Sequence, residues 1–159
     1  MSATAFEKIV IVTRKTRLEE LIGRFNTRAQ AKFCIEHAGG DFAEYEREDA
    51  VYQQALQKVR QALELGLKVQ ILPRDLVPTY LFAPSDLVVT LGQDGLVANT
   101  AKYIDQQPLL AINPDPERFD GVLLPFLPAQ ARAAATAVLR GSFRAREVTL
   151  AEVRLDDGQ

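Results

Sequence analysis

Four short runs rich in branched aliphatic residues interrupt the first 113 residues of the chain, and segments with helical periodicity separate them. The runs are residues 8–13, 67–71, 87–91 and 109–112. Strands covered on both faces are apolar along their whole length, and parallel strands need long crossovers, usually helices. The alternation therefore predicts an α/β fold with a parallel sheet and helices on both faces.

The segments between the first two runs carry signals for helix starts and stops. Thr16-Arg17-Leu18-Glu19 is typical of a capping box at a helix start. A second box-like segment, residues 27–30, predicts that this helix breaks near Phe25–Asn26 and restarts through about His37. A third helix is expected over residues 41–65, with a glycine as its stop.

The second half of the chain begins with a glycine-containing turn over residues 92–95, which predicts a strand–turn–helix unit with its helix over 96–104. A further short strand is expected over residues 121–126. The alanine-rich segment 129–139 has high helix propensity, with Pro128 at its start.

The end of the chain departs from this plan. Residues 146–155 alternate apolar and polar side chains and lead into Asp156-Asp157-Gly158, a hairpin-turn sequence without a second arm. We therefore expect an α/β nucleotide-binding domain over residues 1–127. Residues 128–159 are expected to supply a connecting helix and the first strand or strands of an incomplete β-rich domain.

Charge and composition restrict the classes of function. Among 159 residues, 19 are Lys or Arg and 21 are Asp or Glu, so the formal charge is −2. A general nucleic-acid binder needs an excess of cations to neutralise phosphates, so no nucleic-acid partner is expected. No apolar run reaches the roughly 20 residues that span a bilayer, and the N-terminus lacks a signal-peptide profile, so we expect no membrane partner and a cytoplasmic location.

The strand–turn–helix unit is the best candidate for chemistry, because ligands of open α/β sheets bind beyond the carboxyl ends of the strands. Gly92 and Gly95 let the backbone approach a ligand, and the following helix start directs N–H groups at a phosphate. Asp94 would then place a carboxylate beside that phosphate, where a group that deprotonates a hydroxyl belongs. The simpler alternative is that the glycines only form the turn and Asp94 caps the helix.

Cations elsewhere offer secondary candidates. Arg14 and Lys15 follow the first strand on the same sheet edge, so a phosphate contact is expected there. Arg28 belongs to a group of three cations and several amides at the helix break, which is either a contact for an anionic substrate or a solvated kink. No spacing of acidic, histidine or cysteine residues predicts a protein metal site.

Two segments in the second half of the chain resemble a known family. DLVVTLGQDGLVANTA (residues 86–101) resembles the Gly-Gly-Asp-Gly segment of NAD kinases, which belong with diacylglycerol kinases and 6-phosphofructokinases to one phosphotransferase superfamily. PLLAINPDPERFDGVLLPF (residues 108–126) is similar in placement to that family's strand ending in Gly-x-Asn. Weaker similarity extends to KIVIVT and to REVTLAEVRLDDG.

The resemblance implies an ATP-dependent kinase that phosphorylates the 2′-hydroxyl of NAD, with ATP and Mg²⁺ as cofactors. It implies that Asp94 activates the hydroxyl and that Asn113 contacts the nucleotide. The backbone and side chains of Gly92, Gln93, Gly95 and Leu96 would surround the phosphates. Family members self-associate, so a homo-oligomer is also implied.

Several departures from the family pattern leave alternatives open. Gln93 replaces a glycine, Leu96 replaces a threonine, and Pro114-Asp115-Pro116 replaces a glycine-containing turn. The family's downstream Asn-Glu motif, in an all-β second domain, has no counterpart here, so we expect the chain to lack most of that domain. A sugar or lipid kinase of the same superfamily and a non-catalytic nucleotide-sensing domain are the alternatives.

Overall fold

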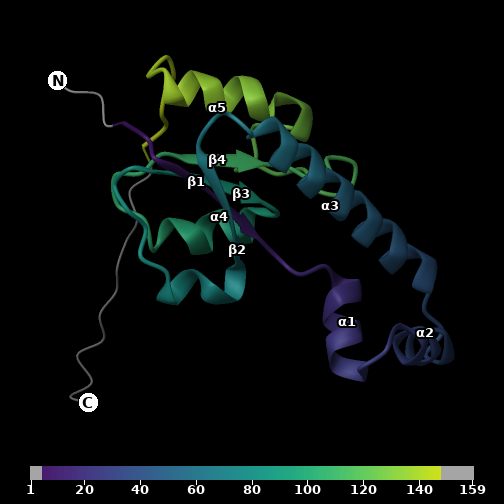
Figure 1. Ribbon diagram of the computed structural model, residues 1–159. Helices are drawn as coiled ribbons and strands as arrows, with labels where there is room; N and C mark the ends of the chain where they lie inside the picture. Colours follow the sequence, from purple (N-terminus) through teal and green to yellow (C-terminus); the bar gives the residue numbers. More distant parts are fainter. Residues whose placement is uncertain (1–4, 148–159) are drawn as a thin grey trace.

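The four branched aliphatic runs form strands that pair into one parallel sheet, as predicted (Figure 1). The computed structural model describes residues 5–147. The strands are β1 (Lys8–Thr13), β2 (Lys68–Pro73), β3 (Asp86–Leu91) and β4 (Leu109–Ile112). Their order is β2-β1-β3-β4, so β1 and β3 occupy the two central positions.

Helices cover both faces of the sheet because side chains alternate between the faces along each strand. On one face, odd-numbered residues of β1 pack against α3 (Phe42–Ala62) and α5 (Ala131–Leu139). On the other face, even-numbered residues of β1 pack against α4 (Asp94–Ala101) and the 3₁₀ helix η1 (Arg74–Thr79). The α/β architecture predicted from the sequence is therefore confirmed.

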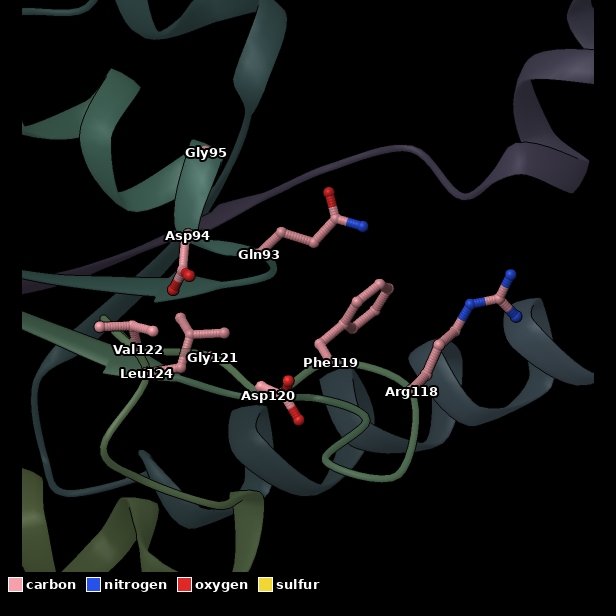
Figure 2. Close-up of a pocket in the computed structure, with 9 residues that line it drawn as sticks. All are labelled: Gln93, Asp94, Gly95, Arg118, Phe119, Asp120, Gly121, Val122 and Leu124. Atoms are coloured by element: carbon pink, nitrogen blue, oxygen red, sulfur yellow. The ribbon is translucent and has the colours of Figure 1, made fainter.

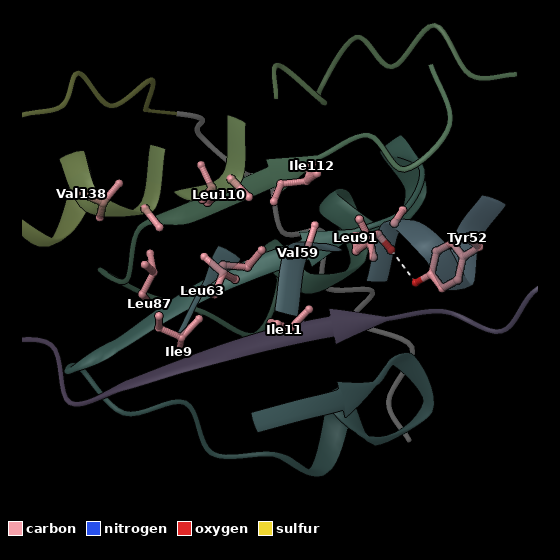
Figure 3. Close-up of a cluster of buried hydrophobic side chains, with 14 residues drawn as sticks. Ile9, Ile11, Tyr52, Val59, Leu63, Leu87, Leu91, Leu110, Ile112 and Val138 are labelled. Carbon is pink, nitrogen blue, oxygen red and sulfur yellow. Dashed lines mark hydrogen bonds between the residues drawn. The ribbon is translucent and has the colours of Figure 1, made fainter. Parts of the chain in front are cut away.

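The larger core lies between β1, β3, β4 and the two helices α3 and α5 (Figure 3). From α3 and its C-cap residue it receives an apolar stripe of buried side chains, Tyr52, Val59 and Leu63. From the strands it receives Ile9, Ile11, Leu87, Val89, Leu91, Leu110 and Ile112.

Two short helices lie past the carboxyl ends of the strands, near the N-terminal end of α3 (Figure 1). They are α1 (Arg17–Phe25) and α2 (Arg28–His37), so the predicted break near residue 25 is confirmed. Asn26 makes the break by adopting a left-handed conformation with φ 68°. Thr16 caps α1 and Thr27 caps α2, each through a side-chain oxygen that accepts a backbone N–H.

Two predictions for the second half of the chain were wrong: the bounds of one helix and the presence of one strand. Helix α4 begins at Asp94 and ends at Ala101, not over 96–104, because Gln93 is the extended N-cap residue. Residues 121–126 form no strand: Gly121 has φ 66°, and Leu124 N–H donates to its carbonyl in a turn. Only Phe126 pairs with the sheet there, through an isolated bridge to Ile112.

The predicted helix near residues 129–139 is present as a 3₁₀ turn, η2 (Pro128–Gln130), followed by α5. Ala131, Ala135 and Val138 of α5 belong to the core of the sheet. The division of the chain at residue 128 stays a prediction, and most of the predicted hairpin over 146–158 lies outside the described residues. Within the described part, none of the helices combines the length and apolar character that crossing a membrane requires.

Tyr52 ties α3 to the ends of both central strands. Its hydroxyl accepts the Arg14 N–H at 3.0 Å and donates to the Leu91 carbonyl at 2.7 Å (Figure 3). Burial raises the pKa of Tyr52 to about 12. The hydroxyl therefore stays protonated in the folded state and satisfies two backbone groups where the loops after β1 and β3 begin.

We expect Tyr52→Phe to lower the free energy of unfolding by about 2 kcal/mol, because two backbone groups lose their hydrogen-bond partner. The folded-state pKa is raised above the unfolded value, so the stabilisation is complete below pH 10 and is lost as the pH rises toward 12. Urea titrations at pH 9 and 11 should show the difference between wild type and variant falling by roughly 1 kcal/mol.

The matched control is Tyr103→Phe, since this tyrosine is exposed. Its effect on stability should be small and should not change between the two pH values. A Tyr52→Phe deficit that stayed constant from pH 9 to 11 would contradict the assigned role of the hydroxyl.

Candidate functional site

The two central strands define where a ligand would bind. The connection after β1 leads through α3 on one face of the sheet, whereas the connection after β3 leads through α4 on the opposite face. In open α/β sheets this divergence of the chain creates a crevice at the carboxyl ends of the strands. The loops that begin at Arg14 and Gly92 flank that crevice.

Gly92 is closely packed at the turn. A Cβ atom at this position would lie 2.8 Å from Leu96 Cδ2 and 3.4 Å from Arg14 Cδ. The first of these distances is closer than real Cβ contacts allow, so a larger residue would push against the buried Leu96 side chain. Gly95 differs, because a Cβ there would meet nothing within 4 Å. Gly95 therefore leaves open space beside the helix start.

A cleft of about 430 Å³ opens at this point, between the start of α4 and the loop after β4 (Figure 2). Figure 2 shows Asp94 and Arg118 toward opposite sides of the cleft, with Phe119 between them. The lining residues are Gln93, Asp94, Gly95, Arg118, Phe119, Asp120, Gly121, Val122 and Leu124.

Asp94 is the first residue of α4 and contributes its carboxylate to the cleft wall. Its Oδ1 accepts the Leu123 N–H at 2.9 Å, which links α4 to the loop on the other side. A carboxylate at the first turn of a helix is favourably placed in the helix dipole. The side chain thus has a structural contact, and its charge is also available at the cleft.

The other residues of the predicted turn occupy different positions. The Gln93 side chain makes no capping hydrogen bond and extends along the cleft (Figure 2). Leu96 has its side chain in the core between sheet and α4, and its N–H donates to Gln93 O at 3.0 Å. The N–H groups of Asp94 and Gly95 precede the first hydrogen bond of the helix, so the helix start presents these two donors.

Asn113 is buried and organises the loop after β4. Its Nδ2 donates to Phe119 O at 2.9 Å, and its Oδ1 accepts the Asp115 N–H at 3.0 Å. A Cβ on Gly121 would lie 2.9 Å from this Nδ2, so the glycine is needed for the loop to close over it. Asn113 therefore shapes the cleft by holding Phe119 and Gly121 in place. Its predicted nucleotide contact stays a prediction.

The predicted cations are separated by the fold. Arg14 lies at the crevice, whereas exposed Lys15 pairs with Asp75 at 3.7 Å. Arg28 is on α2 and pairs with Glu46 at 3.3 Å; it is not among the residues that line the cleft. Of the predicted residues, the structure brings Arg14 together with the strand–turn–helix unit.

A buried carboxylate with three arginines was missed by the sequence analysis. Glu48, on α3, is 4 % exposed and accepts a 2.6 Å hydrogen bond from Arg17 Nε. It also pairs with Arg118 at 3.4 Å and with Arg14 at 3.8 Å. The hydrogen bond to Glu48 raises the pKa of Arg17, so this guanidinium is held in its charged form. We call Glu48 and its three partners the arginine cluster.

Aromatic rings hold the guanidinium groups of the cluster. Arg14 lies 5.1 Å from the ring centre of Tyr52 and 5.6 Å from that of Phe119. Arg17 lies 4.4 Å from the ring centre of Tyr45. Such contacts orient a guanidinium without consuming its in-plane N–H donors. Because Arg118 and Phe119 also line the cleft, the arginine cluster and the cleft are continuous.

A scan against models of known protein families finds no match for this chain, and a search of curated proteins finds none either.

Proposed function

We propose that this chain is the nucleotide-binding part of an NAD kinase-like phosphotransferase, which moves the γ-phosphate of ATP to the 2′-hydroxyl of NAD. The observation that carries the proposal is the position of Asp94. Its carboxylate stands at the first turn of the helix after central strand β3, on the wall of a cleft at the carboxyl edge of the sheet. This is the place where a parallel α/β sheet binds its ligand.

Asp94 would accept a proton from the acceptor hydroxyl as that oxygen attacks the γ-phosphate, the bond to the β-phosphate oxygen breaks and ADP leaves. One carboxylate oxygen is engaged by the Leu123 N–H, which orients the group, and the second oxygen is the one for the proton. The N–H groups of Asp94 and Gly95 and the positive end of the α4 dipole would attract phosphate oxygens. The open space at Gly95 lets a phosphate approach the backbone closely.

The residues of the cleft fit a nucleotide that brings its own cation. In the part of the chain that the structure describes, no three acidic, histidine or cysteine side chains gather as a metal site. Mg²⁺ in kinases is held by one or two carboxylates together with substrate phosphates. Asp120, which lines the same cleft, could supply a carboxylate. When bound, the cation would neutralise the negative charge of the γ-phosphate while this group is transferred from ATP to the acceptor oxygen.

Gln93 favours a second candidate, a kinase of the same superfamily that acts on a sugar hydroxyl. Its uncommitted amide extends along the cleft and could form hydrogen bonds to the hydroxyl groups of a polyol. The exposed side chain of Val122 at the same cleft would suit a more apolar acceptor. The remaining alternative is a non-catalytic sensor, in which the hydrogen bond from the Leu123 N–H would be the role of the Asp94 carboxylate.

The test is formation of NADP from NAD and ATP with Mg²⁺ by the full-length, folded protein, accompanied by calorimetric titration of each nucleotide. Turnover supports the NAD kinase proposal. ATP consumption only with a sugar or lipid acceptor would replace it with the second candidate. Binding of NAD or ATP without turnover on any acceptor would overturn phosphoryl transfer and favour the sensor.

A further inference from the structure

The arginine cluster contains more positive charge than its carboxylate neutralises. Three guanidinium groups pair with one Glu48 carboxylate, so the ion pairs of the cluster contain three positive charges and one negative charge. The Glu44 carboxylate also acts on Arg17 and offsets part of this excess. The nearby carboxylate of Asp49 accepts a hydrogen bond from the Thr16 hydroxyl and pairs with no arginine of the cluster among the described residues. Lys15 and Asp75 pair with each other, so they do not change the balance.

The geometry of the cluster also leaves some guanidinium N–H groups without a hydrogen-bond acceptor. Glu48 makes one short hydrogen bond, to Arg17, while Arg118 and Arg14 approach it only at ion-pair distances of 3.4 and 3.8 Å. Within residues 5–147, neither the Arg14 Nε nor the Arg17 Nη2 finds an acceptor, although both atoms are buried. Buried donors without partners are rare in folded proteins, and each calls for an explanation.

The three arginines of the cluster differ in their exposure to solvent. The side chain of Arg14 is 11 % exposed, whereas Arg17 and Arg118 are 41 % and 35 % exposed. A ligand arriving from the cleft would meet Arg118 first, because Arg118 lines the cleft. The partly exposed Arg17 lies on the same Glu48 carboxylate and would be reached next. The aromatic rings of Tyr45, Tyr52 and Phe119 lie against the guanidinium groups of Arg14 and Arg17. These contacts hold the guanidinium groups in place before the ligand arrives, which lowers the entropy lost on binding.

We propose that the arginine cluster is an anion-binding site that takes a phosphate group of a ligand, with Arg17 and Arg118 as its principal contacts. A phosphate presents three acceptor oxygens on one face, and guanidinium groups bind them through paired N–H donors. Glu48 positions the arginines and prevents their mutual repulsion. Asp94 and Arg118 lie toward opposite sides of the cleft, so the site suits a phosphorylated alcohol whose hydroxyl lies near Asp94 (Figure 2).

This inference goes beyond phosphoryl transfer, because an anion can bind here whether or not the chain catalyses a reaction. The test is calorimetric titration of the full chain with inorganic phosphate and with pyrophosphate, in chloride buffer of matched ionic strength. Arg17→Gln and Arg118→Gln should each weaken binding at least tenfold. Arg17→Lys, which keeps the charge but loses the paired donors, should also weaken binding. Circular dichroism of each variant without phosphate verifies the fold.

The matched control is Arg60→Gln, which removes the same charge from an exposed position on α3. Residue 60 is 12 positions from Glu48, about 18 Å along the helix and beyond the screening length at physiological salt. Phosphate should bind this variant as it binds wild type. The proposal is overturned if phosphate does not bind wild type, or if Arg60→Gln weakens binding as much as the two cluster variants. Because the readout is binding, this failure is distinct from a failure to phosphorylate NAD.

Discussion

Asp94→Asn is expected to lower the rate of NADP formation by a factor of about 10²–10⁴, the range contributed by general acid–base groups. The asparagine keeps an oxygen that can accept the Leu123 N–H, so the link between α4 and the opposite loop survives. What it loses is the negative charge and the ability to take a proton. The free energy of unfolding should therefore change by less than about 1 kcal/mol, through the lost interaction with the helix dipole.

Two further variants separate catalysis from structure. Asp94→Ala removes both the charge and the hydrogen bond, so it should lose turnover and also about 1 kcal/mol of stability. Asp105→Asn is the control, since it makes the same charge change at an exposed position after α4. Its rate should equal that of wild type. If Asp94→Asn turned over NAD at the wild-type rate, Asp94 would be a structural residue and the proposed mechanism would be wrong.

The strands of the fold could be predicted because their signal is local. In β1 and β3, consecutive apolar side chains leave no polar face, which is diagnostic of strands covered on both sides. The break at Asn26 was predictable for the same reason, since the two threonine caps, Thr16 and Thr27, lie eleven positions apart. The strand prediction for residues 121–126 was wrong because a short apolar run with a glycine resembles a strand in sequence. The turn that this segment forms instead depends on its contacts with Asn113, which lies outside the run.

The start of α4 shows why Asp94 could be singled out but not placed. A glycine on each side of Gln93-Asp94 suggested a turn over all four residues. In the structure Gln93 is the extended N-cap residue, and Asp94 enters the helix. The side chain of Leu96 then turns into the core between α4 and the sheet. Motif spacing predicts which residues gather, whereas side-chain direction depends on where the helix begins.

Glu48 was missed because its segment, Glu44-Tyr45-Glu46-Arg47-Glu48-Asp49, has the appearance of a solvated charged face. One signal could have revealed it. Glu48 precedes Tyr52 by four residues, so it continues the apolar stripe of α3 toward the N-terminus. A charged residue on a buried stripe requires partners from elsewhere in the fold. Those partners come from the loop after β1, the first residue of α1 and the loop after β4, which no local pattern connects to α3.

Removing this carboxylate should produce the largest loss of stability. Glu48→Gln is expected to lower the free energy of unfolding by about 3 kcal/mol or more, because breaking a buried ion pair leaves uncompensated charge. Here three guanidinium groups would face a neutral amide, and Arg17 would lose its charge-assisted 2.6 Å hydrogen bond. Urea titration at pH 7 measures the loss. Added salt should reduce it in part, since salt screens repulsion among the exposed ends of the arginines.

Glu46→Gln on the same helix provides the comparison. Glu46 also pairs with an arginine, Arg28, at 3.3 Å, but its side chain is 43 % exposed. Exposed ion pairs contribute about 1 kcal/mol or less, so this substitution should have a small effect. Equal losses in the two variants would mean that burial does not set the strength of the Glu48 interactions. A loss confined to Glu48→Gln would show that this carboxylate is the counter-ion that lets three arginines gather at the carboxyl edge of the sheet.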